Sequence, residues 1–144
     1  MQSATWLRIA AALAAFQTIG HTVGAVLAGP SSAEEAALRE TMGAFRVSLM
    51  GMERSYWDFY LGSGWAITAL AGTLTAVIWF VVPIARELPR AARPIILSLA
   101  AGFAAVTAIS ALYFVTAPIV IAALITVCLV LAALSNPKSP ISNP

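Results

Sequence analysis

The chain has 144 residues, of which 60% are hydrophobic and 10% are charged, and its mean hydropathy is +0.89. A water-soluble domain carries about 25% charged residues, so this composition indicates an integral membrane protein. The net charge of +2 is small and the basic residues are not clustered, which argues against a nucleic-acid partner. The single cysteine, Cys128, excludes an intramolecular disulfide and any CxxC metal or redox motif.

Four segments have the roughly 20 mostly apolar residues that a membrane helix requires. They lie at about 6–28, 56–85, 94–114 and 117–134. Only a few residues join the last two, which forces an antiparallel hairpin. We therefore predict an all-α, antiparallel four-helix bundle that forms one membrane domain over residues 1–135. The polar, proline-rich tail at 136–144 is predicted to be disordered.

The connection between the first two spans predicts an additional helix at about 33–50. Ser32 and Glu35 fit a capping box, in which a hydroxyl and a carboxylate satisfy free N–H groups at a helix start. Apolar residues then recur every three or four positions, which predicts one apolar stripe along a helix. The stripe consists of Leu38, Met42, Phe45, Leu49 and Met52. We expect this amphipathic helix on the outside of the bundle or in the membrane interface.

Lysine and arginine residues predict the orientation of the chain. With four spans, one side carries five cationic residues, and the other carries three cationic residues alongside four glutamates. The first group is Arg8, Arg86, Arg90, Arg93 and Lys138, and the second is Arg39, Arg46 and Arg54. The positive-inside rule then places both termini in the cytoplasm. The expected location is the bacterial inner (cytoplasmic) membrane.

Polar residues of the spans gather toward the outward-facing helix ends. His21, the only histidine, lies about two turns from the outer end of the first span, and Gln17 lies one turn deeper on the same face. Arg54 and Asp58 are four residues apart at the start of the second span, so they are expected to pair. Ionisable groups within a span cost at least ~2.5 kcal/mol near the helix centre and usually mark a site. The predicted site residues are Gln17, His21, Arg54, Asp58, Tyr60, Ser110 and Tyr113.

Each of these residues also has a structural interpretation. Interfacial charges can pair with each other, tyrosines can form an ordinary aromatic belt, and a neutral His21 can be a packing device. Gly20 and Gly24, on either side of His21, are predicted to let a neighbouring helix approach closely.

Three sequence elements resemble a family of small uncharacterised bacterial four-span integral membrane proteins. They are "GHTVG" at 20–24, "ERSYWDFYLGSG" at 53–64 and "ALYFVTAPIV" at 111–120. The residues that match the family pattern are His21, Arg54, Trp57, Asp58, Gly62, Tyr113 and Pro118. Leu112 departs from it, because the family has a more polar residue there. The resemblance implies the four-span architecture and no activity.

Two functions from different classes fit these observations. The first is binding of a lipid-like or other hydrophobic small molecule in an outer-leaflet polar pocket of the bundle. The second is a membrane-embedded acid/base enzyme, an isomerase or cyclase, in which His21 and Asp58 act as base and acid on a hydrophobic substrate. A weaker third interpretation is a proton-coupled carrier that works as an oligomer. No metal or cofactor is expected, the expected partners are membrane lipids or a hydrophobic small molecule, and a homo-oligomer is left open.

Overall fold

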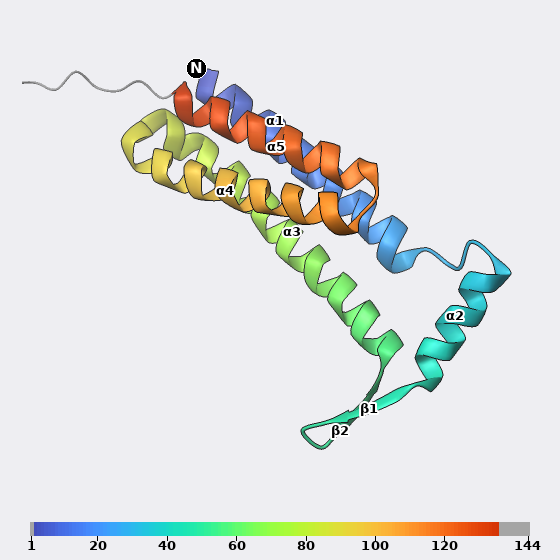
Figure 1. The fold of residues 1–144 in the computed structure, drawn as a ribbon. Helices are drawn as coiled ribbons and strands as arrows, with labels where there is room; N and C mark the ends of the chain where they lie inside the picture. The colour runs from blue at the N-terminus through green and yellow to red at the C-terminus, as the bar shows by residue number, and fades with distance from the viewer. Residues whose placement is uncertain (1, 136–144) are drawn as a thin grey trace, which may run out of the picture. The chain divides into compact units, whose positions relative to one another are not determined.

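The computed structural model describes residues 2–135 and is almost entirely helical, which confirms the all-α prediction. Four helices are long and apolar enough to cross a membrane: α1 with its π-helical extension η1, α3, α4 and α5. The chain is therefore a membrane protein with a fifth, shorter helix between the first two spans. Figure 1 shows the elements, which are α1 (Gln2–His21), η1 (Thr22–Leu27), α2 (Ala33–Ala44), β1 (Arg46–Leu49), β2 (Met52–Ser55), α3 (Tyr56–Glu87), α4 (Pro89–Tyr113) and α5 (Thr116–Leu134).

The long helices extend further than the apolar runs that predicted them. Helix α1 begins at Gln2 rather than near residue 6, and α4 begins at Pro89 rather than at Pro94. Pro89 suits the first turn, where its missing N–H is not needed, whereas Pro94 lies inside the helix. Charged residues mark the end of an apolar run in the sequence. They do not end a helix, because its last turns can continue into the hydrated interface.

The chain divides into two compact units. Residues 2–17 and 72–135 form the bundle unit, and residues 18–71 form the connector unit. The prediction of one membrane domain over residues 1–135 stays a prediction. The predicted disordered tail at 136–144 lies outside the described residues.

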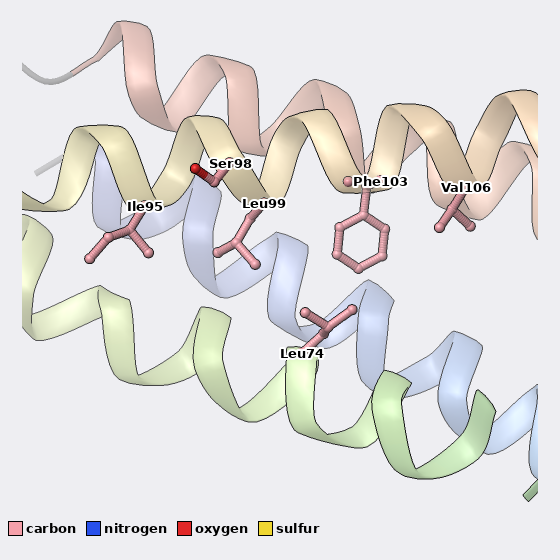
Figure 2. A pocket seen from close by; sticks show the side chains of 7 residues that line it. Leu74, Ile95, Ser98, Leu99, Phe103 and Val106 are labelled. Atoms are coloured by element: carbon pink, nitrogen blue, oxygen red, sulfur yellow. The ribbon is translucent and has the colours of Figure 1, made fainter. Parts of the chain in front are cut away.

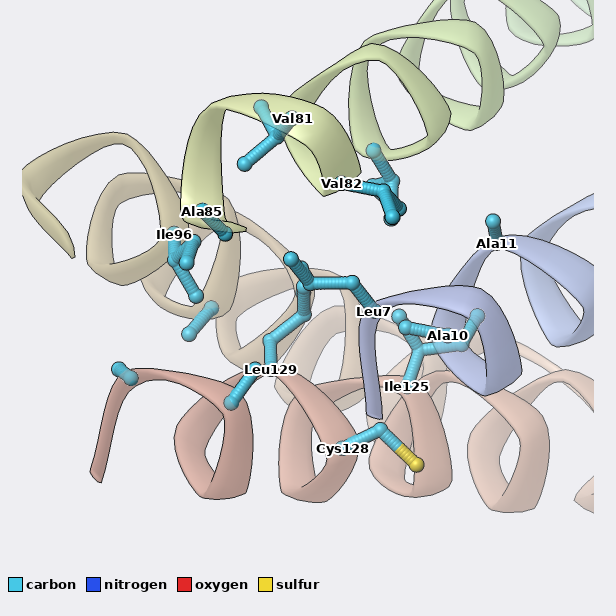
Figure 3. Packing of buried hydrophobic residues seen from close by; sticks show 14 of the residues in the cluster. Leu7, Ala10, Ala11, Val81, Val82, Ala85, Ile96, Ile125, Cys128 and Leu129 are labelled. Carbon is cyan, nitrogen blue, oxygen red and sulfur yellow. The ribbon is translucent and has the colours of Figure 1, made fainter. Parts of the chain in front are cut away.

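One buried core joins segments of α1, α3, α4 and α5 within the bundle unit (Figure 3). Small side chains dominate it, because lipid tails are as apolar as leucine and helices in a bilayer associate mainly through close packing. The largest fully buried side chains interdigitate between these alanines; they are Leu7, Ile78, Ile96, Ile125 and Leu129. The buried alanines are Ala4, Ala10, Ala11, Ala14, Ala85, Ala92, Ala100, Ala122, Ala132 and Ala133.

Helices α4 and α5 form the antiparallel hairpin that the sequence predicts. Only Phe114 and Val115 separate them. The N–H of Phe114 donates to the carbonyl of Ser110 at 2.9 Å and closes the last turn of α4. Pro118 lies in the first turn of α5, as expected for a residue without an N–H group.

The connector unit corrects the predicted helix at 33–50. Helix α2 ends at Ala44, and an antiparallel hairpin of β1 and β2 follows, which the sequence analysis did not predict. The two-residue turn between the strands is formed by Met50 and Gly51, which both have positive φ, at 51° and 79°. Phe45, Leu49 and Met52 have helical spacing, whereas Phe45, Val47 and Leu49 alternate as in a strand, so the helical spacing assigned this segment to the wrong element.

Candidate functional site

His21 connects α1 with α3 inside the connector unit. Its Nε2 atom lies 3.2 Å from the carbonyl oxygen of Gly64. Because a carbonyl can only accept a hydrogen bond, Nε2 must carry the proton, which leaves Nδ1 with the lone pair if the ring is neutral. One turn further along α3, the hydroxyls of Thr22 and Thr68 are 3.1 Å apart. The histidine is thus partly buried and hydrogen-bonded to a backbone group rather than to an acidic partner.

Gly64, rather than Gly20 or Gly24, is the glycine that allows the close approach. A Cβ atom at Gly64 would lie 3.0 Å from Cγ2 of Val26, whereas a Cβ at Gly20 or Gly24 would meet nothing within 4 Å. The predicted role of Gly20 in α1 and Gly24 in η1 is therefore wrong within this chain. Close packing depends on the α3 side of the contact, where Gly64 also supplies the carbonyl that His21 binds.

Asp58 caps the start of α3 instead of pairing with Arg54. The N–H of Ser55 donates to Oδ2 of Asp58 at 2.8 Å, and the N–H of Asp58 donates to Oγ of Ser55 at 3.1 Å. These reciprocal bonds form a capping box that satisfies two backbone donors at the helix start. Arg54 instead donates through Nη1 to the carbonyl of Glu53. The expected salt bridge between Arg54 and Asp58 is absent from residues 2–135.

Arg39 contacts three different parts of the connector unit. It donates to Oε1 of Glu35 and to the carbonyl of Ala28, which follows η1, at 3.0 Å. Its guanidinium also lies over the ring of Trp57 in α3, 5.0 Å from the centroid. A cation over tryptophan is attracted by the ring quadrupole, typically by about 0.5–1 kcal/mol at an exposed site. Arg39 therefore joins α2 to the end of the first span and the beginning of the second.

The start of α2 follows the predicted capping box only in part. Oγ of Ser32 accepts from the N–H of Glu35 at 3.2 Å, as predicted. The Glu35 carboxylate, however, accepts from the N–H and hydroxyl of Ser31, at 2.8 and 2.7 Å. Hydrogen bonds from Ser31, together with Arg39, lower the pKa of Glu35 to about 2. The carboxylate is thus held in its charged form by several donors.

The seven predicted site residues are divided between the two units. His21, Arg54, Asp58 and Tyr60 belong to the connector unit, where Tyr60 stacks on Trp57 at 5.3 Å. The bundle unit holds the others: Ser110 is buried, Tyr113 is 78% exposed, and Oε1 of Gln17 is buried without a hydrogen-bond partner. Within the connector unit, no hydrogen bond or salt bridge joins His21, Arg54, Asp58 and Tyr60 to one another. As a ligand-binding or catalytic set, they stay a prediction. A metal-holding group of three or more His, Cys, Asp or Glu side chains is also absent from the described residues.

An apolar groove of about 350 Å³ lies in the bundle unit between α3 and α4 (Figure 2). Phe103 is 8% exposed and belongs to its floor, while Leu74 at 38% and Val106 at 39% belong to its rim. Ser98 is the one lining residue with a polar side chain. The full lining is Leu74, Ile95, Ser98, Leu99, Gly102, Phe103 and Val106.

Sequence reasoning missed the groove because its residues look like ordinary packing. The lining of α4 recurs at helical spacing, which equally predicts a stripe that contacts another helix. The one informative signal is Gly102 within that stripe, since a Cβ there would meet nothing within 4 Å. A glycine in a helix interior costs about 1 kcal/mol relative to alanine. In α4, the absence of a side chain at Gly102 leaves open space and does not bring another helix into contact.

No family model matches this chain, and no curated protein or solved structure matches it either. The resemblance to small bacterial four-span membrane proteins therefore stays a prediction.

Replacing Gly64 with leucine is expected to separate α1 and α3 near His21. The new side chain would collide with Val26, and overpacking of this kind typically costs about 1–3 kcal/mol. Thermal unfolding in detergent should show a lower midpoint for Gly64→Leu than for the wild type. Gly62→Leu is the matched control, because a Cβ at Gly62 meets nothing within 4 Å. Equal midpoints for the two variants would contradict the close contact.

Acidification is expected to loosen the start of α2. The folded-state pKa of Glu35, about 2, lies below the ordinary value of 4.5, so its stabilising effect is complete above pH ~4.5. The effect is lost as the pH falls toward 2. The ¹⁹F NMR resonance of 5-fluorotryptophan at Trp57, under Arg39, should shift over this window. Glu35→Gln should remove the shift and Glu40→Gln should keep it; an unchanged titration in Glu35→Gln would refute the assignment.

Proposed function

We propose that this protein binds a lipid-like or other hydrophobic small molecule in the groove between α3 and α4. The observation that supports the proposal is the groove itself, with its buried aromatic floor, its partly exposed rim and its single hydroxyl. Ligand sites are mostly apolar clefts of about 300–1,000 Å³ with a few polar groups, and this groove falls at the small end of that range. A ligand of this class reaches the groove sideways from the bilayer.

The dimensions of the groove favour one extended hydrocarbon chain. At 1.5 Å per residue, the lining from Ile95 to Val106 extends over roughly 16 Å of α4. The hydrocarbon core of a bilayer is about 30 Å thick, so this length corresponds to about one leaflet. Isoprenoid and acyl chains are the membrane molecules with this shape. A bulky polar head group would have to lie beyond the ends of the groove.

The groove begins near the basic end of α4. Ile95 follows Arg90 and Arg93 within two turns, and these arginines belong to the side that the positive-inside rule assigns to the cytoplasm. The proposed site is therefore in the cytoplasmic leaflet, whereas the polar residues of the sequence predict a pocket in the outer leaflet. The proposal keeps the expected ligand class and changes the residues and the leaflet.

We further propose that both termini are cytoplasmic and that the membrane is the inner membrane of a bacterium. The support is the charge distribution, together with the resemblance of three sequence elements to bacterial four-span proteins. Among the described residues, Arg8, Arg86, Arg90 and Arg93 lie on the proposed cytoplasmic side.

Single cysteines test the orientation. In a Cys128→Ala background, Ala33→Cys should react with a membrane-impermeant maleimide in intact cells. Gln2→Cys should react only after the membrane is permeabilised. Both positions are exposed at the surface of the chain, so access to the side chain does not limit labelling. Reaction of Gln2→Cys in intact cells would reverse the orientation and assign the groove to the outer leaflet.

Filling the groove tests the function. Gly102→Leu should occupy the open space without a clash and should improve the helix propensity of α4. Native mass spectrometry of wild-type protein extracted from membranes should reveal a co-purifying hydrophobic molecule, and Gly102→Leu should lose at least nine-tenths of it. The thermal unfolding midpoint of the variant should equal or exceed that of the wild type.

The matched control is Ala101→Leu, which adds the same side chain at an exposed neighbouring position outside the groove. It should retain the bound molecule. Equal occupancy in both variants, or a wild-type protein that carries nothing under gentle extraction, would overturn the proposal.

A further inference from the structure

The hairpin formed by β1 and β2 has one apolar face and one polar face. Its register pairs Val47 with Arg54 and Leu49 with Met52. Because side chains alternate along a strand, these residues share a face. Three of the four are apolar, and Leu49 and Met52 are more than half exposed. The opposite face carries Arg46, Ser48, Glu53 and Ser55.

The turn of the hairpin presents a fully exposed methionine. Met50 has a relative exposure of 101% and a φ of 51°, a left-handed conformation in which glycine, asparagine and aspartate are preferred. In water, a polar residue would suit this position better both for its conformation and for its exposure. Met50 suits neither the left-handed backbone conformation nor full exposure to water, and we take this as a sign that its surroundings are not water. For methionine, that environment is apolar.

The hairpin has little of its own to stabilise it. Two strands without further cover are marginally stable in water. At the base of the hairpin, Phe45 and Tyr56 make one edge-to-face contact at 5.2 Å, and the N–H of Tyr56 donates to the carbonyl of Phe45 at 3.2 Å. The exposed apolar face lies beyond this base, so an outside surface has to cover it.

We propose that the apolar face and the Met50 tip of this hairpin bind the lipid surface of the bilayer. Strand β2 ends at Ser55 and the membrane helix α3 begins at Tyr56, so the hairpin is attached to a span without any linker. The bilayer is therefore always within reach. Apolar side chains enter the boundary of the acyl chains, and Arg54, on the same face next to the span, reaches the lipid phosphates by snorkelling.

A second copy of the chain is a poorer match for this face. A stable protein interface buries about 1,200–2,000 Å² in total, which the apolar side chains of Val47, Leu49, Met50 and Met52 alone cannot supply. Arg54 is the one charged residue on this face, and a guanidinium suits the phosphates of a lipid surface.

Depth-dependent quenching tests the proposal in the full-length protein. In a Cys128→Ala background, a bimane probe is attached to Met50→Cys, Leu49→Cys or Ser48→Cys, and each protein is reconstituted into phosphatidylcholine–phosphatidylglycerol vesicles. Shallow doxyl lipids should quench the probe at 49 and 50 at least twofold more than the probe at 48. Equal quenching at the three positions, or no quenching at any, would overturn the proposal. So would efficient disulfide cross-linking of Met50→Cys between copies at a low protein-to-lipid ratio.

A second variant separates contact with lipid from the geometry of the turn. Met50→Asn favours the left-handed conformation and removes the apolar tip. With the probe at Met52→Cys, Met50→Asn should lower quenching by shallow doxyl lipids at least twofold, whereas Ser48→Asn, on the polar face, should leave it unchanged. Unchanged quenching in Met50→Asn would show that the tip does not bind lipid.

Discussion

Close packing through small side chains is the constraint on which the bundle unit depends. In a bilayer, the surrounding lipid is as apolar as the helix surfaces, so burial of leucine against leucine gives little preference for helix association. Alanine permits backbones to approach, and ten of the nineteen buried apolar residues in the described part of the chain are alanine. Larger side chains such as Leu7 and Leu129 then fill the spaces that the alanines leave (Figure 3). Between α3 and α4, no large side chain fills the space beside Gly102, and this space is part of the groove.

The connector unit is stabilised in a different way. Within residues 18–71, Ser55 is the only buried residue, so an apolar core contributes almost nothing to this unit. Its segments are held by polar contacts: His21 to Gly64, Ser55 to Asp58, and Arg39 to Glu35, Ala28 and Trp57. Polar groups in or beside a membrane have few alternatives to such bonds, because unsatisfied backbone and side-chain groups cost several kcal/mol in hydrocarbon. A unit built from individual bonds depends on a few residues, among which Arg39 joins α2 to both adjacent spans.

The sequence predicted the spans well because their signal is long and their physics is simple. About 20 apolar residues can be accommodated by almost nothing except a membrane helix, so errors were confined to the ends, as at Pro89 and Pro94. The hairpin was missed because Leu49 and Met52 continue the helical spacing of the apolar stripe that precedes them. The turn at Met50 and Gly51 offered only one of the usual turn residues. The sequence also contained the signal for the partner of Asp58, because Ser55 and Asp58 have capping-box spacing. The opposite charge of Arg54, four residues before Asp58, predicted a salt bridge instead.

Two of the polar residues that drew attention in the sequence, His21 and Asp58, form hydrogen bonds within the chain. A polar group inside or at the start of a span needs a hydrogen-bond partner. His21 has the backbone carbonyl of Gly64, and Asp58 binds the N–H of Ser55 at the start of α3. Binding surfaces for hydrophobic molecules need the opposite property, namely apolar atoms that the chain leaves uncovered. Such atoms lie in the α3–α4 groove and on the face of the hairpin that carries Leu49 and Met52. In a membrane protein of this composition, an uncovered apolar surface with a defined shape is therefore better evidence of a binding site than an ionisable residue with its hydrogen bonds satisfied.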